Sequence, residues 1–224
     1  SIKNRIKKNK LMAEKQITVD YYYDYSCPWT YLSYKRLNQT VLRTASLINW
    51  KPIEITLIRS LIKKKLTETL PAVSNYQTKD LQDWANYCSL KIKIQKDIGH
   101  EVSKKALQGA LYAIEKGKIY KYSGLVFQSY FGESLDISNI EILLEIAEKL
   151  DLNKKEFRAV IETGHYEKEL KSNAQELINR GGFGSPTMFV EDKMFFGNDR
   201  MNLVEFAIGQ ASGKILVIPG QHNS

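Results

Sequence analysis

YYYDYSCPWTYLSYKRL, residues 21–37, contains the junction between two kinds of predicted secondary structure. The segment at its start, ITVDYYY at 17–23, alternates apolar and polar residues and is rich in β-branched and aromatic side chains, as strands are. From Pro28 onward the apolar residues recur every three to four positions, and proline suits the first turn of a helix. The sequence therefore places Cys27 where a strand gives way to a helix.

A thiol in this position has a specific chemical environment. The N–H groups of the first helical turn lack helical partners, and together with the positive end of the helix dipole they favour an anion. We therefore expect the pKa of the Cys27 thiol to be lowered toward thiolate, with the Thr30 hydroxyl as an additional donor. Thr30 stands where a C-x-x-C redox motif would have its second cysteine. Cys27 is the candidate catalytic residue, and it lacks an adjacent resolving thiol.

The second cysteine, Cys88, is predicted to be structural. Leu81, Trp84 and Cys88 are spaced by three and four, as on one face of a helix, and a buried free cysteine behaves as a small hydrophobic residue. Two cysteines exclude a disulfide scaffold and point to a reducing compartment, so we expect a cytoplasmic location. No metal site is expected.

The middle of the chain predicts one more strand and then helices. LINWKPIEITLI at 47–58 reads as the second strand, in which Pro52 indicates an irregularity or a sheet edge. Five helical segments follow, with Asp136 or Ser138 as the expected N-cap of the fourth and Asn153 of the fifth. These segments lie at 80–90, 103–116, 118–131, 138–150 and 154–162.

The last third of the chain returns to strands. Residues 165–180 predict a helix that ends at a glycine pair, and 186–192 and 193–197 predict two short strands joined by a tight turn. A helix from about 199 to 209 closes the fold. The order of elements predicts an α/β domain divided by a helical insertion, with functional groups at the turn that carries Cys27.

GGFGSPTMFVEDKMFFGNDRM, residues 181–201, is a second candidate for chemistry. A cis bond before Pro186 would leave a free backbone edge at Ser185, which could pair with an extended peptide-like ligand. Asn198 and Asp199 open the predicted last helix, where free N–H groups can hold a carboxylate and the Asp199 side chain can pair with an ammonium. An α-amino acid head, such as the γ-glutamyl end of glutathione, carries both charges. Simple capping by Asn198 and Asp199 is the alternative.

Together these motifs resemble the DsbA-like thioredoxin superfamily, and within it the kappa-class glutathione transferases and 2-hydroxychromene-2-carboxylate isomerases. The resemblance rests on D-Y-S-C-P-W-T-Y-L, on DLQDWA and SLKIKI in the helical middle, and above all on residues 181–201, and it extends from Ile17 to Gln210. It implies a thioredoxin-like domain interrupted by a large helical insertion. The implied parts are a basic tail at 1–15, a thioredoxin-like domain at 16–60 and 170–214, and the insertion at 61–169.

The resemblance also implies roles for individual positions. In that branch a serine stands at the position of Cys27, and its hydroxyl is hydrogen-bonded to the glutathione sulfur. The cis-proline of the family matches Pro186, and the backbone of Ser185 matches the partner of the cysteinyl part of glutathione. Asn198 and Asp199 match the residues that hold the γ-glutamyl group. The cysteine in place of the family serine also resembles the dithiol relatives.

A lysine beyond the second strand contacts the glycyl carboxylate in the relatives. Lys63, Lys64 and Lys65 compete for that match here, and we take Lys64, with a solvated lysine run as the alternative. Thr30 completes the expected glutathione-binding set.

Three functions follow from this resemblance. The first is a glutathione-dependent isomerase or transferase, in which glutathione attacks a small electrophilic substrate. The second is a monothiol thiol–disulfide oxidoreductase in which Cys27 itself attacks and an external thiol releases it. The third is a binding module that keeps the groove without catalysis. Relatives often pair, so a homodimer is also an expectation.

The charge of the chain is concentrated at its start. The formal net charge is +8, and five cations without any acid fall in residues 1–11. Such a tail could touch phosphates or anionic lipid, but we interpret it as a solvated segment and expect neither nucleic acid nor membrane as a partner. It lacks the apolar core of a secretory signal, and no apolar run approaches the ~20 residues of a membrane helix.

Overall fold

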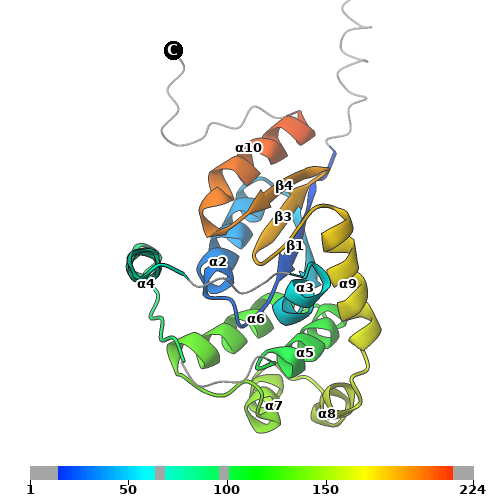
Figure 1. Ribbon diagram of the computed structural model, residues 1–224. Helices are drawn as coiled ribbons and strands as arrows, with labels where there is room; N and C mark the ends of the chain where they lie inside the picture. Colours follow the sequence, from blue (N-terminus) through cyan, green and yellow to red (C-terminus); the bar gives the residue numbers. More distant parts are fainter. Residues whose placement is uncertain (1–14, 64–68, 96–100, 214–224) are drawn as a thin grey trace, which may run out of the picture.

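The computed structural model of this protein describes residues 15–63, 69–95 and 101–213. Within them lies a mixed four-stranded sheet in the order β2-β1-β3-β4 (Figure 1). β1 pairs with β2 in parallel and with β3 antiparallel, and β3 pairs antiparallel with β4. The strands are β1 (Thr18–Tyr23), β2 (Leu47–Pro52), β3 (Thr187–Val190) and β4 (Lys193–Phe196).

Helices cover both faces of this sheet. α2 (Pro28–Arg43) and α10 (Met201–Ser212) pack together, while α9 (Glu167–Asn179) packs on β2 and on α3 (Ile55–Leu61). Successive side chains of β1 point to opposite faces of the sheet, so neighbouring tyrosines join different cores. Tyr21 and Tyr23 join the core that includes α2 and α10, while Tyr22 joins the smaller core beneath α9 and α3.

Most of the helical insertion lies below the sheet in the view of Figure 1. It adjoins the end of β1, where Tyr25 contacts Phe127 with ring centroids 5.0 Å apart, and Tyr31 stacks on Phe131 at 5.5 Å. One continuous apolar core therefore joins the sheet to the insertion. The elements of the helical insertion are α4 (Pro71–Tyr87), α5 (Lys104–Glu115), α6 (Ile119–Phe127), a π-helical turn (Gln128–Gly132), α7 (Ile140–Lys149) and α8 (Lys154–Thr163).

The predicted second strand was too long. β2 ends at Pro52, and the chain then turns into α3 from Ile55. The carboxylate of Asp24 accepts the Ile55 N–H at 2.8 Å and so satisfies a donor at the start of α3. This partner lies 31 residues away in the sequence, so local periodicity could not reveal it. Pro52 does lie on an edge strand, as predicted.

Two further boundaries differ from the prediction. α4 begins at Pro71, nine residues before the predicted segment, because a proline at the first helical position starts it. The N-cap of α7 is Asn139, whose side chain accepts the Glu141 N–H, rather than Asp136 or Ser138. Asn153 caps α8 as predicted.

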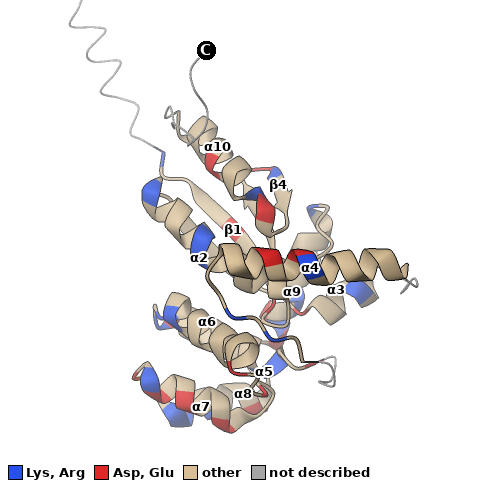
Figure 2. Cartoon of the chain, turned by 90° about the vertical axis from the view of Figure 1, so that its left-hand side faces the viewer, with Lys and Arg blue, Asp and Glu red and all other residues tan. Residues whose placement is uncertain are grey.

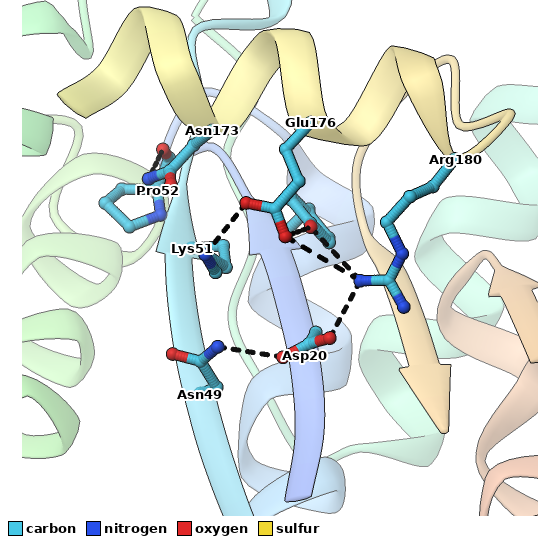
Figure 3. A network of polar contacts seen from close by, with 8 residues as sticks. Asp20, Asn49, Lys51, Pro52, Asn173, Glu176 and Arg180 are labelled. Atoms are coloured by element: carbon cyan, nitrogen blue, oxygen red, sulfur yellow. Dashed lines mark hydrogen bonds and ion pairs between the residues drawn. The ribbon is translucent and has the colours of Figure 1, made fainter. Parts of the chain in front are cut away.

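A polar network fastens α9 to the sheet (Figure 3). Arg180 donates to Asp20 on β1 at 2.7 Å and to the Glu191 carbonyl at 2.8 Å. Glu176 accepts from the Tyr22 hydroxyl at 2.7 Å and from Lys51 at 2.9 Å. These contacts connect β1, β2 and the turn after β3 to α9 and its C-cap, so they hold the chain where it returns from the insertion to the sheet.

The described surface carries charges of both signs. Arg158 on α8 pairs with Glu141 on α7 and with Glu162 one turn along, and blue and red residues lie side by side on these helices in Figure 2. Such exposed pairs contribute little to stability. None of the described helices combines the length and the apolar composition that crossing a bilayer would require.

Candidate functional site

Cys27 occupies the N-cap position of α2, with Pro28 in the first turn. The loop before it is fixed by Asp24, whose buried carboxylate accepts from the Ser26 N–H at 2.8 Å and from the Ser26 hydroxyl at 2.9 Å. The other oxygen of the same carboxylate accepts the Ile55 N–H. One side chain therefore fixes both the Cys27 loop and the start of α3, and no local sequence pattern predicted this role for Asp24.

The two sequence motifs meet at Ser185. The Ser185–Pro186 peptide bond is cis, and the Ser185 carbonyl accepts a hydrogen bond from the Cys27 thiol at 3.2 Å. The Ser185 hydroxyl accepts the Asp24 N–H at 3.1 Å and lies 2.6 Å from the Thr30 hydroxyl. Thr30 is fully buried, so its hydroxyl faces Ser185 and serves to hold that residue in place.

The pKa of the Cys27 thiol is raised above its usual value, in contrast to our expectation. Burial disfavours the thiolate and outweighs the lowering by the Thr30 hydroxyl and by the N–H groups of Thr30 and Trp29, while Asp24 raises the pKa further. The geometry agrees, because the sulfur faces a carbonyl oxygen, which requires a thiol proton. Cys27 does lie at the start of a helix, as predicted, but its raised pKa keeps the thiol protonated there.

Two adjoining cavities open at this position, and Trp29, Ser185 and Phe196 line both. Cavity 1, of about 290 Å³, is also lined by Trp84 and by Asp199. Cavity 2 measures about 410 Å³, and its further walls come from the Cys27 loop, α3 and the loop before Ser185. The remaining lining residues of cavity 2 are Ser26, Cys27, Pro28, Ile55, Arg59, Phe183 and Gly184.

Asn198 and Asp199 have different surroundings although they are adjacent. Asn198 is buried, and both its carbonyl and its side-chain oxygen accept from Arg36 on α2, at 2.6 and 2.7 Å. Asp199 is partly exposed in cavity 1, and its Oδ2 pairs with Arg200 at 2.8 Å. Neither side chain caps α10, because residues 198–200 form a short 3₁₀ turn before that helix.

Arg36 connects this turn to the insertion. Its guanidinium lies 4.8 Å from the ring centre of Trp84 on α4, in addition to its bonds to Asn198. Figure 2 shows α4 lying across α2 at this place. Arg36 follows Cys27 by nine positions in the sequence, and no local pattern marked it as part of the site.

The predicted lysine position is outside the description of the structure. Lys64 and Lys65 fall among the residues that are not described, and the exposed Lys63 does not line either cavity. The basic residue that does line cavity 2 is Arg59. The prediction of a strand over 47–58 left out helix α3, so Arg59 was not recognised as a candidate site residue.

Within the described ranges, the two cysteines are free thiols, and no cluster of histidine, cysteine or acidic side chains could hold a metal ion. Cys88 is half-buried at the end of α4.

A strand, a helix start that carries a cysteine, and a cis-proline loop facing it, all on a four-stranded mixed sheet, define a thioredoxin-like protein with a helical insertion. The family model for the DSBA-like thioredoxin domain matches residues 18–209, and the chain belongs to that family.

Similar proteins extend this assignment. 2-hydroxychromene-2-carboxylate isomerase of Pseudomonas putida is 26% identical over 86% of this chain and 94% of its own length. A solved structure of a 2-hydroxychromene-2-carboxylate isomerase has a TM-score of 0.76 at 24% identity, covering 87% of this chain and 95% of its own. The cytosolic disulfide reductase DsbM from Pseudomonas aeruginosa, solved with GSH, has a TM-score of 0.60 at 14% identity, covering 88% of this chain and 98% of its own. The two structures show a shared fold.

Proposed function

We propose that this protein is a glutathione-dependent enzyme of the 2-hydroxychromene-2-carboxylate isomerase and kappa-class glutathione transferase type. The observation that carries the proposal is the pair of cavities that meet at Ser185, with Asp199 in one and Cys27 in the other. This arrangement suits an extended thiol tripeptide with a charged head at one end. The P. putida relative is named as an isomerase, and DsbM was solved with GSH.

Each part of glutathione has a proposed partner. The γ-glutamyl ammonium pairs with the Asp199 carboxylate in cavity 1, where Arg200 engages only one of its oxygens. The cysteinyl backbone pairs with the Ser185 main chain. The sulfur then enters cavity 2 beside Cys27.

The neutral Cys27 thiol suits a donor role. It can turn its S–H from the Ser185 carbonyl toward the glutathione sulfur and stabilise that thiolate, as the serine of the relatives does. The thiolate adds to an electrophilic carbon of the substrate and forms a C–S bond, while the electron pair of the carbon–carbon double bond moves onto a conjugated carbonyl group. In a conjugation the resulting enolate takes a proton from water. In an isomerisation the former double bond rotates, the electron pair returns and the glutathione thiolate is expelled. A raised thiol pKa disfavours the alternative in which Cys27 attacks a disulfide.

Asp199→Ala tests the proposal. Removing the carboxylate should weaken glutathione binding about tenfold, since a charge-assisted hydrogen bond in a partly exposed site is lost. Isothermal titration calorimetry measures this, with Asp192→Ala, an exposed turn residue outside both cavities, as the matched control. The proposal is wrong if glutathione does not bind to the wild-type protein, or if Asp199→Ala binds it as well as Asp192→Ala does.

A further inference from the structure

A third cavity, of about 380 Å³, has walls from α2 and from α6, which lies beneath α2 in Figure 2. Tyr34 of α2 and Tyr120 of α6 both line it, and their ring centroids lie 5.7 Å apart. None of the residues that line this cavity lines cavity 1 or cavity 2. This cavity, cavity 3, is therefore separate from the proposed glutathione site.

The Tyr34 hydroxyl is a donor without an acceptor in the part of the chain that the structure describes. Tyr34 is only 4% exposed, yet its hydroxyl makes no hydrogen bond to another described residue. A Cβ at Gly124 would lie 2.6 Å from the hydroxyl oxygen, so the glycine leaves room for that oxygen at the cavity wall. Burial raises the pKa of Tyr34, which keeps the phenol protonated. A ligand oxygen in cavity 3 would supply the hydrogen bond that this buried hydroxyl lacks.

Two lysines at cavity 3 also lack partners. Lys35 on α2 and Lys121 on α6 both line the cavity, and neither side chain has an ion pair or hydrogen bond with a described residue. Lys118, three positions before Lys121, donates to the carbonyl of Leu150, another lining residue, and brings a third positive charge close by. No acidic residue is among the described residues that line the cavity. The walls therefore concentrate positive charge that an anionic ligand can neutralise.

The outer wall of cavity 3 offers an aromatic surface. Tyr120 is 39% exposed, so its ring is open to stacking with a planar ligand ring. Gln128 also lines the cavity, and its side-chain nitrogen donates to Glu133, which leaves its amide oxygen as an acceptor. Cavity 3 thus combines a stacking surface, an acceptor, a phenol donor and two unpaired cations.

We propose that cavity 3 binds a nucleoside monophosphate. Lys35, Lys121 and the Tyr34 hydroxyl hold the phosphate, and the base stacks on Tyr120. A phosphate dianion matches two unpaired ammonium groups, which bind phosphate as point charges, whereas a carboxylate would neutralise only one of them. The volume of cavity 3 falls within the range of about 300–1,000 Å³ that is usual for small-ligand sites. This inference does not depend on glutathione, so it is tested separately from the proposed function.

Calorimetric titrations of the wild-type protein with AMP, GMP, CMP and UMP, and with the four corresponding nucleosides, test the ligand class. We expect at least one monophosphate to bind about tenfold more tightly than its nucleoside, because the nucleoside lacks the charge that the lysines bind. Inorganic phosphate, which has no ring to stack, should bind about tenfold more weakly than that monophosphate. The proposal is overturned if no monophosphate binds more tightly than its nucleoside, or if inorganic phosphate binds as tightly as the monophosphates do.

Substitutions then locate the site with the monophosphate that binds most tightly. Lys35→Gln, Lys121→Gln and Tyr34→Phe should each weaken its binding about fivefold, because each removes one partner of the phosphate. Lys155→Gln, at an exposed lysine on α8 that has no ion pair with a described residue and does not line cavity 3, should leave the affinity unchanged. The two lysine substitutions are at exposed positions, so they test the site even if Tyr34→Phe loses stability.

Nucleotide binding that survives both Lys35→Gln and Lys121→Gln as fully as it survives Lys155→Gln would place the phosphate elsewhere and overturn the proposal. Titration of the same variants with glutathione separates the two sites, because we expect its affinity to stay at the wild-type value in all of them. Failure of glutathione to bind the wild-type protein would refute the proposed function, while the nucleotide titrations would still decide the role of cavity 3.

Discussion

At Cys27, two opposing effects act on one thiol. The helix start offers N–H donors that favour thiolate, and burial against the Ser185 loop favours the protonated form. Burial is the larger effect, so the residue differs from the activated cysteine of a disulfide oxidoreductase. A protonated thiol is a hydrogen-bond donor, and this suits the donor role proposed for Cys27 better than the role of a nucleophile.

The reactivity of Cys27 should follow this raised pKa. In a Cys88→Ser background, the rate of alkylation by iodoacetamide should rise with pH and give an apparent pKa above the ~8.5 of free cysteine. Thr30→Val, which removes a hydroxyl that lowers the pKa, should raise it further. Rapid alkylation at neutral pH, with an apparent pKa below that of free cysteine, would contradict the neutral thiol and favour the oxidoreductase alternative.

At the scale of elements, α9 matters because it carries the chain from the insertion back to the sheet. Its network joins Arg180 to Asp20 and Glu176 to Tyr22 and Lys51 (Figure 3). Burial alone would raise the pKa of Glu176, but the hydrogen bonds from Lys51 and Tyr22 lower it below its usual value. Arg180 also lies over the Phe189 ring at 3.7 Å. The network therefore combines charge pairing with packing.

Arg180→Gln should destabilise the protein by about 2 kcal/mol, because Asp20 keeps a partly buried charge without its partner. The midpoint of urea unfolding measures this change. Arg158→Gln removes exposed ion pairs on α8 and should change the free energy of unfolding by less than about 0.5 kcal/mol. Equal effects of the two substitutions would show that the α9 network is not a stabilising element.

For the whole molecule, the core is unusually rich in tyrosine. Five tyrosines, at 21, 22, 23, 25 and 122, are completely buried. Tyr25 packs against Tyr122 and Phe127, so these rings connect the sheet to the insertion. Burial raises the pKa of Tyr21 and of Tyr25, and it raises that of Tyr122 well above the usual value. The folded state therefore keeps protons that the unfolded chain would release.

The protein should unfold cooperatively in alkali. Because the buried tyrosines have raised pKa values in the folded state, their contribution to stability is fully present below the ordinary tyrosine pKa of about 10. That contribution is lost as the pH rises above this value. Each buried tyrosine that keeps its proton in the folded state lowers the free energy of unfolding by about 1.4 kcal/mol per pH unit above the ordinary tyrosine pKa. Tyrosinate absorbance and circular dichroism should change together, and Tyr21→Phe should reduce the pH slope by one proton. Ionisation of the buried tyrosines without loss of helix would contradict this.

Local patterns were sufficient for much of the fold and for part of the site. The junction at Cys27, the helix that begins at Pro28, the Asn153 cap and the hairpin of β3 and β4 all follow from neighbours within a few residues. These features depend on backbone propensity and periodicity, which a single sequence carries. The cis bond before Pro186 was expected from the resemblance to the DsbA-like superfamily.

Contacts between distant segments decided the rest. The first N–H of α3 binds Asp24, 31 residues earlier, where a continuing strand was predicted, and Arg59 of this helix lines cavity 2. Asn198 is buried because Arg36, 162 residues earlier, binds it. The pKa of the Cys27 thiol is raised because burial beside the Ser185 loop disfavours the thiolate. Sequence alone determined which chemical groups the site contains, and tertiary packing decided their protonation and their neighbours, since burial and long-range hydrogen bonds arise only when the chain has folded.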